Sequence, residues 1–104
     1  MVAYNVFFSS RAGAEEATVV AAVRGFLDEM KSAGRLRGYR ILRVTDPASF
    51  PALPRFQAII DFQSQQELDD AMAFMRQPGK VHEGAHGRMM GLITDFKVSF
   101  AADA

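Results

Sequence analysis

Hydrophobic residues follow two different spacings along this chain, and each change of spacing marks a new predicted element. Residues 2–9 are rich in aromatic and β-branched types, which is typical of a strand. Between residues 14 and 33 the apolar positions recur at intervals of three and four, and Gly34 follows them, so an amphipathic helix is predicted here. Its buried stripe is expected to hold Val19, Val23, Phe26, Leu27 and Met30.

The second half of the chain repeats this order with an extra strand. Residues 39–45 and 55–62 are predicted strands, and the prolines within 46–54 stiffen the connection between them. Ser64 and Glu67 have the spacing of a capping box, in which the Ser64 hydroxyl accepts from the Glu67 N–H and the Glu67 carboxylate accepts from the Ser64 N–H.

The second helix is therefore predicted to begin at Ser64, and Pro78-Gly79 ends it. The glycine-rich residues 80–90 are expected to form a loop or a single helical turn, and residues 92–100 a final strand. The predicted order is β-α-β-β-α-β, in one domain over 1–104.

Alternation along the strands separates two faces of the predicted sheet. One face is almost wholly apolar and suits a core beneath both helices: Val2, Tyr4, Val6, Phe8, Phe56, Ala58, Ile60, Phe62, Leu92, Phe96, Val98 and Phe100. The other face mixes apolar and polar residues: Asn5, Phe7, Tyr39, Ile41, Arg43, Gln57, Ile59, Asp61, Ile93, Asp95 and Lys97.

This mixed face is too apolar for solvent and too polar for a dry core. Phe7, Ile41, Ile59 and Ile93 together suggest an interaction surface, whereas Asn5 and the other polar groups need partners. A sheet-to-sheet dimer that encloses a partly polar cavity meets both requirements.

In its element order, length and two-faced sheet, the chain resembles the dimeric α+β barrel superfamily, in which two ferredoxin-like subunits pack sheet against sheet. The resemblance implies an α+β fold with a four-stranded antiparallel sheet, two helices on one face and a homodimer. Members include antibiotic-biosynthesis-type monooxygenases, haem-degrading enzymes and muconolactone-isomerase-like proteins. The resemblance also implies a small-molecule pocket between sheet and helices and leaves the reaction open.

Composition excludes several classes of function. The 12 basic residues balance 12 acidic ones, so there is no overall charge to attract nucleic acid or an anionic membrane. Without cysteine there is no disulfide, thiolate nucleophile or iron–sulfur cluster. Residues 1–8 lack the features of a secretory signal, and no apolar run approaches the roughly 20 residues of a membrane span. We therefore expect a cytoplasmic protein.

The segment His82-Glu83-Gly84-Ala85-His86 spells the H-E-x-x-H motif of zinc peptidases. Glycines surround it and no glutamate follows it to supply a third ligand, so we expect neither a metal site nor a cofactor. A metal bound with Asp61 or Asp95, a haem, and two ordinary loop histidines remain the alternatives. If the segment is functional, we favour His86 as a pocket acid, base or hydrogen-bond donor.

RNA binding is a candidate function because the RNA recognition motif has the same element order. Residues 55–62 are similar to its central strand, but Gln57 and Ile59 stand where aromatic rings stack on bases, and Asp61 adds negative charge. We therefore expect no nucleic-acid partner. The basic cluster nearby is interpreted as a solvated rim: Arg35, Arg37, Arg40 and Arg43.

Several residues are candidates for ligand binding. Alternation places Arg43 on the open face, where it would anchor a carboxylate or an enolate-like oxygen, or pair with Asp61 or Asp95. Tyr39 and Asn5 are candidate donors to a carbonyl, or else satisfy polar groups of the interface. The predicted ligand-binding residues are Asn5, Phe7, Tyr39, Arg43, Gln57 and His86, and the catalytic candidates are His86, His82 and Arg43.

We therefore predict a homodimer that binds a small hydrophobic or aromatic molecule. If it is an enzyme, the resemblance implies a cofactor-independent monooxygenase-like or isomerase-like reaction on an enolisable substrate. The alternative is a non-catalytic, stress-related or interaction module whose open face only forms the dimer. A pocket requires room between Phe7, Gln57 and residues 80–91.

Overall fold

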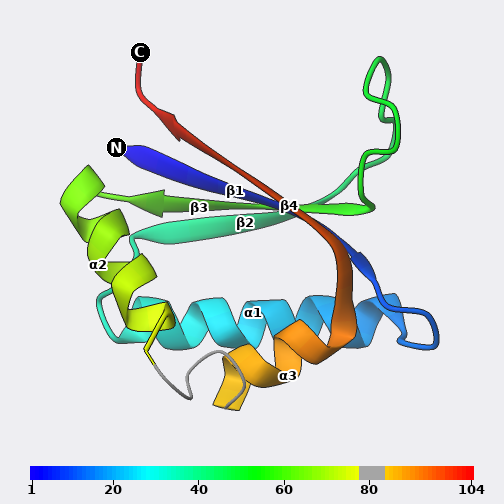
Figure 1. Ribbon diagram of the computed structural model, residues 1–104, viewed down its shortest axis with the longest axis horizontal. Coiled ribbons are helices and arrows are strands. Elements are labelled where there is room, and N and C mark those ends of the chain that lie inside the picture. The colour runs from blue at the N-terminus through cyan, green and yellow to red at the C-terminus, as the bar shows by residue number, and fades with distance from the viewer. Residues whose placement is uncertain (78–83) are drawn as a thin grey trace.

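The computed structural model describes residues 1–77 and 84–104. Strands β1 (Val2–Ser10), β2 (Gly38–Arg43), β3 (Phe56–Phe62) and β4 (Ile93–Ala102) form one antiparallel sheet in the order β2-β3-β1-β4. Helices α1 (Glu16–Ser32), α2 (Gln65–Met75) and α3 (Gly84–Leu92) lie on one side of it (Figure 1). This is the predicted ferredoxin-like fold, with α3 added before the last strand.

The predicted helix ends are largely confirmed. Gly34 adopts φ +74° just after α1, a conformation that favours glycine, and its N–H donates to the Lys31 carbonyl at 2.9 Å. The Ser64 hydroxyl accepts from the Glu67 N–H at 3.2 Å and caps α2. The Glu67 carboxylate was expected to return to Ser64, but it pairs instead with the Arg37 guanidinium at 3.0 Å.

The core lies between the helices and the face predicted for it on β1 and β3. Phe8 and Phe56 are 1% exposed, and their rings stack at 5.4 Å. Along β3 every second residue is buried, while the residues between are only partly covered. The helices contribute most of the remaining buried residues: Val19, Val23, Leu27, Met30, Leu68, Ala71 and Met89.

The predicted faces of β2 were wrong. Tyr39 lies opposite Ile60 and Ile41 opposite Ala58, and cross-strand partners point to the same face. Tyr39, Ile41 and Arg43 therefore lie on the helix-covered face. Leu42 instead lies on the open face, opposite Gln57.

The prediction for β4 was partly wrong because of a bulge. The pairing with β1 shifts between Phe7 and Ser9, and Asp95 adopts φ +52° beside the shift. Ile93, predicted for the open face, is consequently buried in the core at 4% exposure. Beyond the bulge Phe96, Val98 and Phe100 lie on the helix side as expected, yet they stay exposed along the sheet edge.

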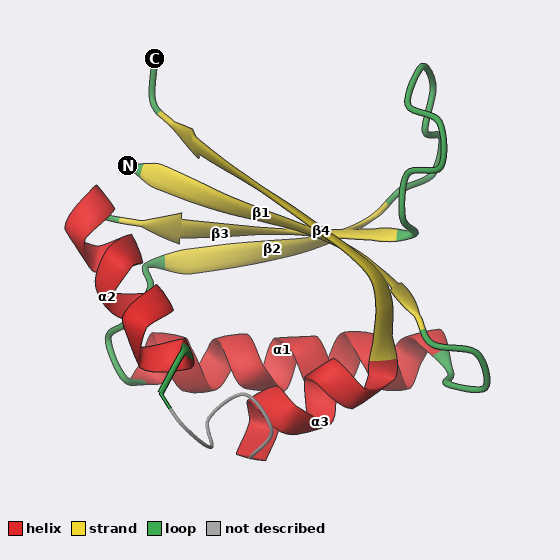
Figure 2. Ribbon diagram, in the orientation of Figure 1, coloured by secondary structure: helices red, strands yellow, loops and turns green. Residues whose placement is uncertain are grey.

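Residues 84–92 form a longer helix than the expected loop or single turn. Figure 2 shows α3 lying beside α1 and running directly into β4. Glycine disfavours helix, but Met89 is buried against the core, and this packing outweighs the local preference. No helix within the described ranges is long and apolar enough to span a membrane.

Candidate functional site between sheet and helices

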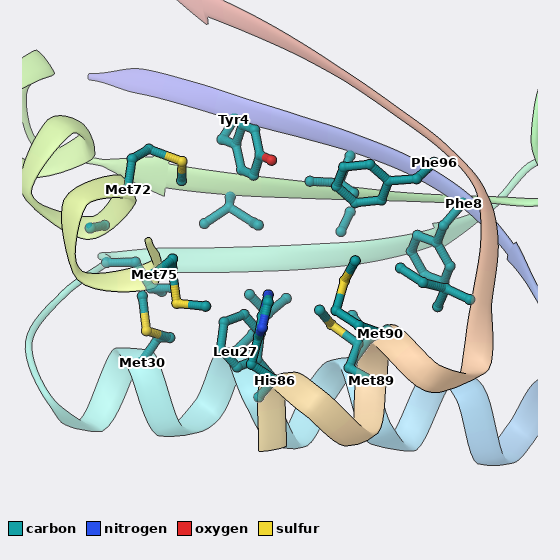
Figure 3. A pocket seen from close by; sticks show the side chains of 18 of the residues that line it. Tyr4, Phe8, Leu27, Met30, Met72, Met75, His86, Met89, Met90 and Phe96 are labelled. Carbon is teal, nitrogen blue, oxygen red and sulfur yellow. The ribbon is translucent and has the colours of Figure 1, made fainter. Parts of the chain in front are cut away.

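A cavity of about 130 Å³ lies between the sheet and all three helices. Its walls come from β1, β3 and β4 above and from the helices below (Figure 3). Among the described residues that line it, Tyr4 and His86 alone carry side-chain nitrogen or oxygen atoms. The cavity therefore suits an apolar molecule with one or two hydrogen-bonding groups.

Methionines make much of this wall adaptable. Five of the six methionines of the chain line the cavity: Met30, Met72, Met75, Met89 and Met90. Methionine is unbranched and polarisable, so it fits ligands of different outline better than valine or isoleucine. The site is therefore suited to ligands that differ in shape.

His86 extends from α3 into the cavity (Figure 3). Its imidazole packs against the Phe26 ring of α1, with the ring centroids 4.9 Å apart. Met89 and Met90 follow three and four residues later, so one side of α3 supplies all three side chains. Among the predicted site residues that the structure describes, His86 is the one that lines this cavity.

Tyr4 enters the cavity from β1, on the sheet side (Figure 3). Its ring stacks on Phe100 of β4 at 5.0 Å. Burial raises the pKa of the Tyr4 hydroxyl, and the positive charge of Arg76 opposes this with a smaller lowering. Tyr4 is thus protonated at neutral pH and available to donate a hydrogen bond.

Asn5, Phe7 and Gln57 lie on the other face of the sheet. Phe7 is opposite Gln57, and Asn5 opposite Ile59. The sheet separates them from α3, so the expected room between Phe7, Gln57 and the 80–91 segment is not found in the described part of that segment. Within one subunit these three residues cannot share a cavity with His86.

Tyr39 and Arg43 lie at the β2 edge and are engaged by α1. The Tyr39 hydroxyl donates to Asp28, and burial together with this carboxylate raises the pKa of Tyr39. Arg43 pairs with Glu16, not with the expected Asp61 or Asp95. Hydrogen bonding from Arg43 lowers the pKa of Glu16.

His82 and Glu83 lie outside the described residues, so the structure does not place the H-E-x-x-H segment as a unit. Within residues 1–77 and 84–104, no three histidine, aspartate or glutamate side chains come together as a metal site would require.

The main residue that the sequence did not suggest is Tyr4. Alternation places Tyr4 correctly on the core face, where the sequence indicates a packing role only. A tyrosine among aliphatic core positions is itself a signal, because its hydroxyl needs a partner or a polar space when the ring is buried. The sequence likewise predicts Phe26 on the buried stripe of the first helix, but it does not predict the contact of Phe26 with His86.

Residues 1–101 match the model of a family described as a family of unknown function, DUF6614. No curated protein matches the chain significantly. Among solved structures, At3g17210 from Arabidopsis thaliana is 10% identical and superposes with a TM-score of 0.79 over 100% of this chain and 96% of that chain.

Two further structures share the architecture. A hydroxynitrile lyase from Passiflora edulis is 11% identical, with a TM-score of 0.69 over 95% of this chain and 89% of its own. A dimeric ferredoxin-like protein of unknown function from Thermobifida fusca is 14% identical, with a TM-score of 0.62 over 97% and 89%. At these identities the similarity shows the fold alone. The chain thus has the ferredoxin-like fold and belongs to the DUF6614 family.

Proposed function

We propose that the protein is a homodimer that binds a small hydrophobic or aromatic molecule in the cavity between its sheet and helices. The observation that carries this proposal is the apolar cavity of about 130 Å³ into which Tyr4 and His86 bring the polar groups. An apolar cavity of about 150 Å³ is known to hold benzene. The enclosed part of the ligand is therefore about the size of one aromatic ring.

The two polar side chains suit a ligand with a carbonyl or hydroxyl group. The neutral Tyr4 hydroxyl donates to the ligand oxygen, and His86 accepts or returns a proton at a neighbouring carbon. This arrangement fits an isomerase-like proton shift on an enolisable substrate, or a cofactor-independent monooxygenase-like reaction in which dioxygen is the co-substrate and oxidant. The Passiflora edulis protein is an enzyme with this fold, which supports a catalytic role for the site.

The open face of the sheet supports the dimer. Phe7, Leu42 and Ile59 lie there half-buried, and no helix of the described residues covers them. Apolar residues gathered on a sheet face mark an interaction surface. The Thermobifida fusca protein with this fold is dimeric, and a second copy packed sheet against sheet would cover the same face here.

The alternative is a non-catalytic module whose open face serves only to form the dimer. The same apolar face favours it, because a dimer alone explains Phe7, Leu42 and Ile59. The two functions differ in whether the cavity binds a molecule. In the alternative function it binds none.

Matched substitutions on α2 separate the two. Ala71 is 1% exposed and lines the cavity, whereas Ala73 faces solvent on the same helix. Ala71→Leu fills the cavity and is expected to cost about 1–3 kcal/mol if neighbours must shift. Ala73→Leu should change little.

The measurement is native mass spectrometry of protein purified from cells, followed by thermal melts with small aromatic alcohols and ketones. If the cavity binds a ligand, the parent protein should be a dimer that carries extra mass, and a ligand should raise its Tm. Both effects should persist in Ala73→Leu and disappear in Ala71→Leu that is still folded. If no probe raises the Tm of the parent protein, or if Ala71→Leu responds as the parent does, the cavity is not the binding site.

A further inference from the structure

A second depression adjoins the cavity on the outside of the molecule. It has a volume of about 310 Å³ and is lined by Gln65, Leu68, Asp69, Met72, Arg76 and Phe100, between α2 and β4. We call it the α2–β4 groove. Met72 belongs to both spaces, and Tyr4 of the cavity stacks on Phe100 of the groove. A single layer of side chains therefore separates groove from cavity.

The groove has two charged side chains, Asp69 within α2 and Arg76 just after its last residue. The cavity is lined by Ala71, Met72 and Met75, which belong to the last two turns of the helix, and Arg76 follows them directly. Asp69 lies seven residues before Arg76, about 10 Å along a helix axis, and accepts a hydrogen bond from Gln65 at 2.9 Å. Arg76 thus lies directly beyond Met75, the last α2 residue of the cavity wall.

Arg76 is exposed, and within the described residues no hydrogen bond or ion pair engages its side chain. A cation at a helix C-terminus is favourable by itself, which would account for an arginine here. Its position does more than that, because its charge is felt at the Tyr4 hydroxyl inside the cavity.

The strand beside the groove has apolar side chains that the described chain covers only in part. Phe96 also lines the cavity, and Phe100 lines the groove; they are 46% and 58% exposed on the helix side of β4. Val98 lies between them on the same side and is 42% exposed. A ligand that extended out of the cavity would pass beneath this apolar strip towards Arg76.

From this geometry we infer that the site takes an amphipathic carboxylate, with its ring or short alkyl part in the cavity and its carboxylate on Arg76 in the groove. The inference rests on the proposed function, because the apolar part uses the same cavity. A guanidinium presents two parallel N–H donors that match a carboxylate, so Arg76 is suited to this group more than to a neutral oxygen.

The test compares 4-phenylbutanoate with its neutral isostere 4-phenylbutanamide by isothermal titration calorimetry at low salt. The parent protein should bind the acid about fivefold more tightly, the scale of a partly exposed charge pair. Arg76→Gln should remove this preference, because the acid loses its cationic partner. Asp69→Asn should strengthen binding of the acid alone. Arg88→Gln is the matched control, since Arg88 is exposed on α3 and lines neither space.

The possible failures are distinguishable. If acid and amide bind equally well to the parent protein, or if Arg76→Gln keeps the preference, the inference is wrong while the cavity remains a binding site. If neither probe binds the parent protein, the proposed function fails and the inference falls with it. A loss of preference in Arg88→Gln equal to that in Arg76→Gln would reduce the effect to overall charge and also overturn the inference.

Discussion

The imidazole of His86 lies against the phenyl ring of Phe26, with the centroids 4.9 Å apart and the planes inclined by 58°. The contact joins α3 to α1 at the cavity, because both side chains line it. We therefore expect Phe26 to limit the rotation of the imidazole and so to set the direction in which its nitrogens meet a ligand. In this prediction Phe26 is a positioning residue that acts through His86.

Replacing Phe26 with leucine should release the His86 ring and enlarge the cavity. We expect a stability loss of about 1–2 kcal/mol, below that of a fully buried phenylalanine because the ring is only half-buried. The NMR signals of the His86 ring should shift, since the ring current of Phe26 disappears. Phe50→Leu is the control, because Phe50 is 65% exposed in the connection between β2 and β3. An unchanged His86 spectrum in Phe26→Leu would contradict this positioning role.

Two neighbouring residues of β2 test the faces of the sheet. Ile41 lies on the helix-covered face and Leu42 on the open face. Ile41→Asp should lower the free energy of unfolding by about 3 kcal/mol or more, because it places a charge beside the core. Leu42→Asp should change the stability of the subunit little and dissociate the dimer. Thermal melts and analytical ultracentrifugation measure the two effects, and a Leu42→Asp protein that sediments like the parent would remove Leu42 from the interface.

The same pair shows why part of the sheet was predictable from sequence and part was not. In β1 and β3 one set of alternate residues is apolar, and the other set includes Asn5, Gln57 and Asp61. Only one choice of which face points to the helices therefore buries the apolar side chains. In β2 both sets are apolar enough, since Tyr39 and Ile41 compete with Leu42 and Val44. The pairing of β2 with β3 decides between them, and that pairing is a tertiary property.

The candidate site was predicted less well for a related reason. His86 was named from its residue type, and the structure places it in the cavity. Tyr39 and Arg43 also have suitable chemistry, but α1 presents Asp28 and Glu16 to them, and only the packing of α1 on the sheet reveals this. Tyr4 and Arg76 gain their interest from the approach of α2 to β1 and β4, which local sequence does not encode.

The bulge in β4 depends on the backbone conformation of Asp95. Its φ of +52° is accessible to glycine and asparagine but strained for a β-branched residue. We expect Asp95→Val to cost about 1–2 kcal/mol and Asp95→Gly to be neutral within about 0.5 kcal/mol, because the lost pair with Lys97 is exposed. Urea unfolding measures both. Equal stability of the valine and glycine variants would show that the bulge does not constrain this residue.

Both tyrosines of the chain should titrate above the ordinary value. The pKa values of Tyr4 and Tyr39 are each raised from 10.0, mainly by burial, with Asp28 adding to the rise at Tyr39. The folded state therefore holds these protons more tightly than the unfolded state. The resulting stabilisation is complete below pH 10 and is lost as the pH rises through the folded values.

Ultraviolet absorbance of tyrosinate measures the titration directly. In Tyr39→Phe the single remaining phenol belongs to Tyr4, so its midpoint reports the environment of the cavity. We expect this midpoint above 10 in the folded protein and near 10 in urea. A bound ligand that accepts a hydrogen bond from Tyr4 should raise it further, since ionisation would break that bond. A native midpoint at or below 10 would instead place the Tyr4 hydroxyl in water, outside the cavity.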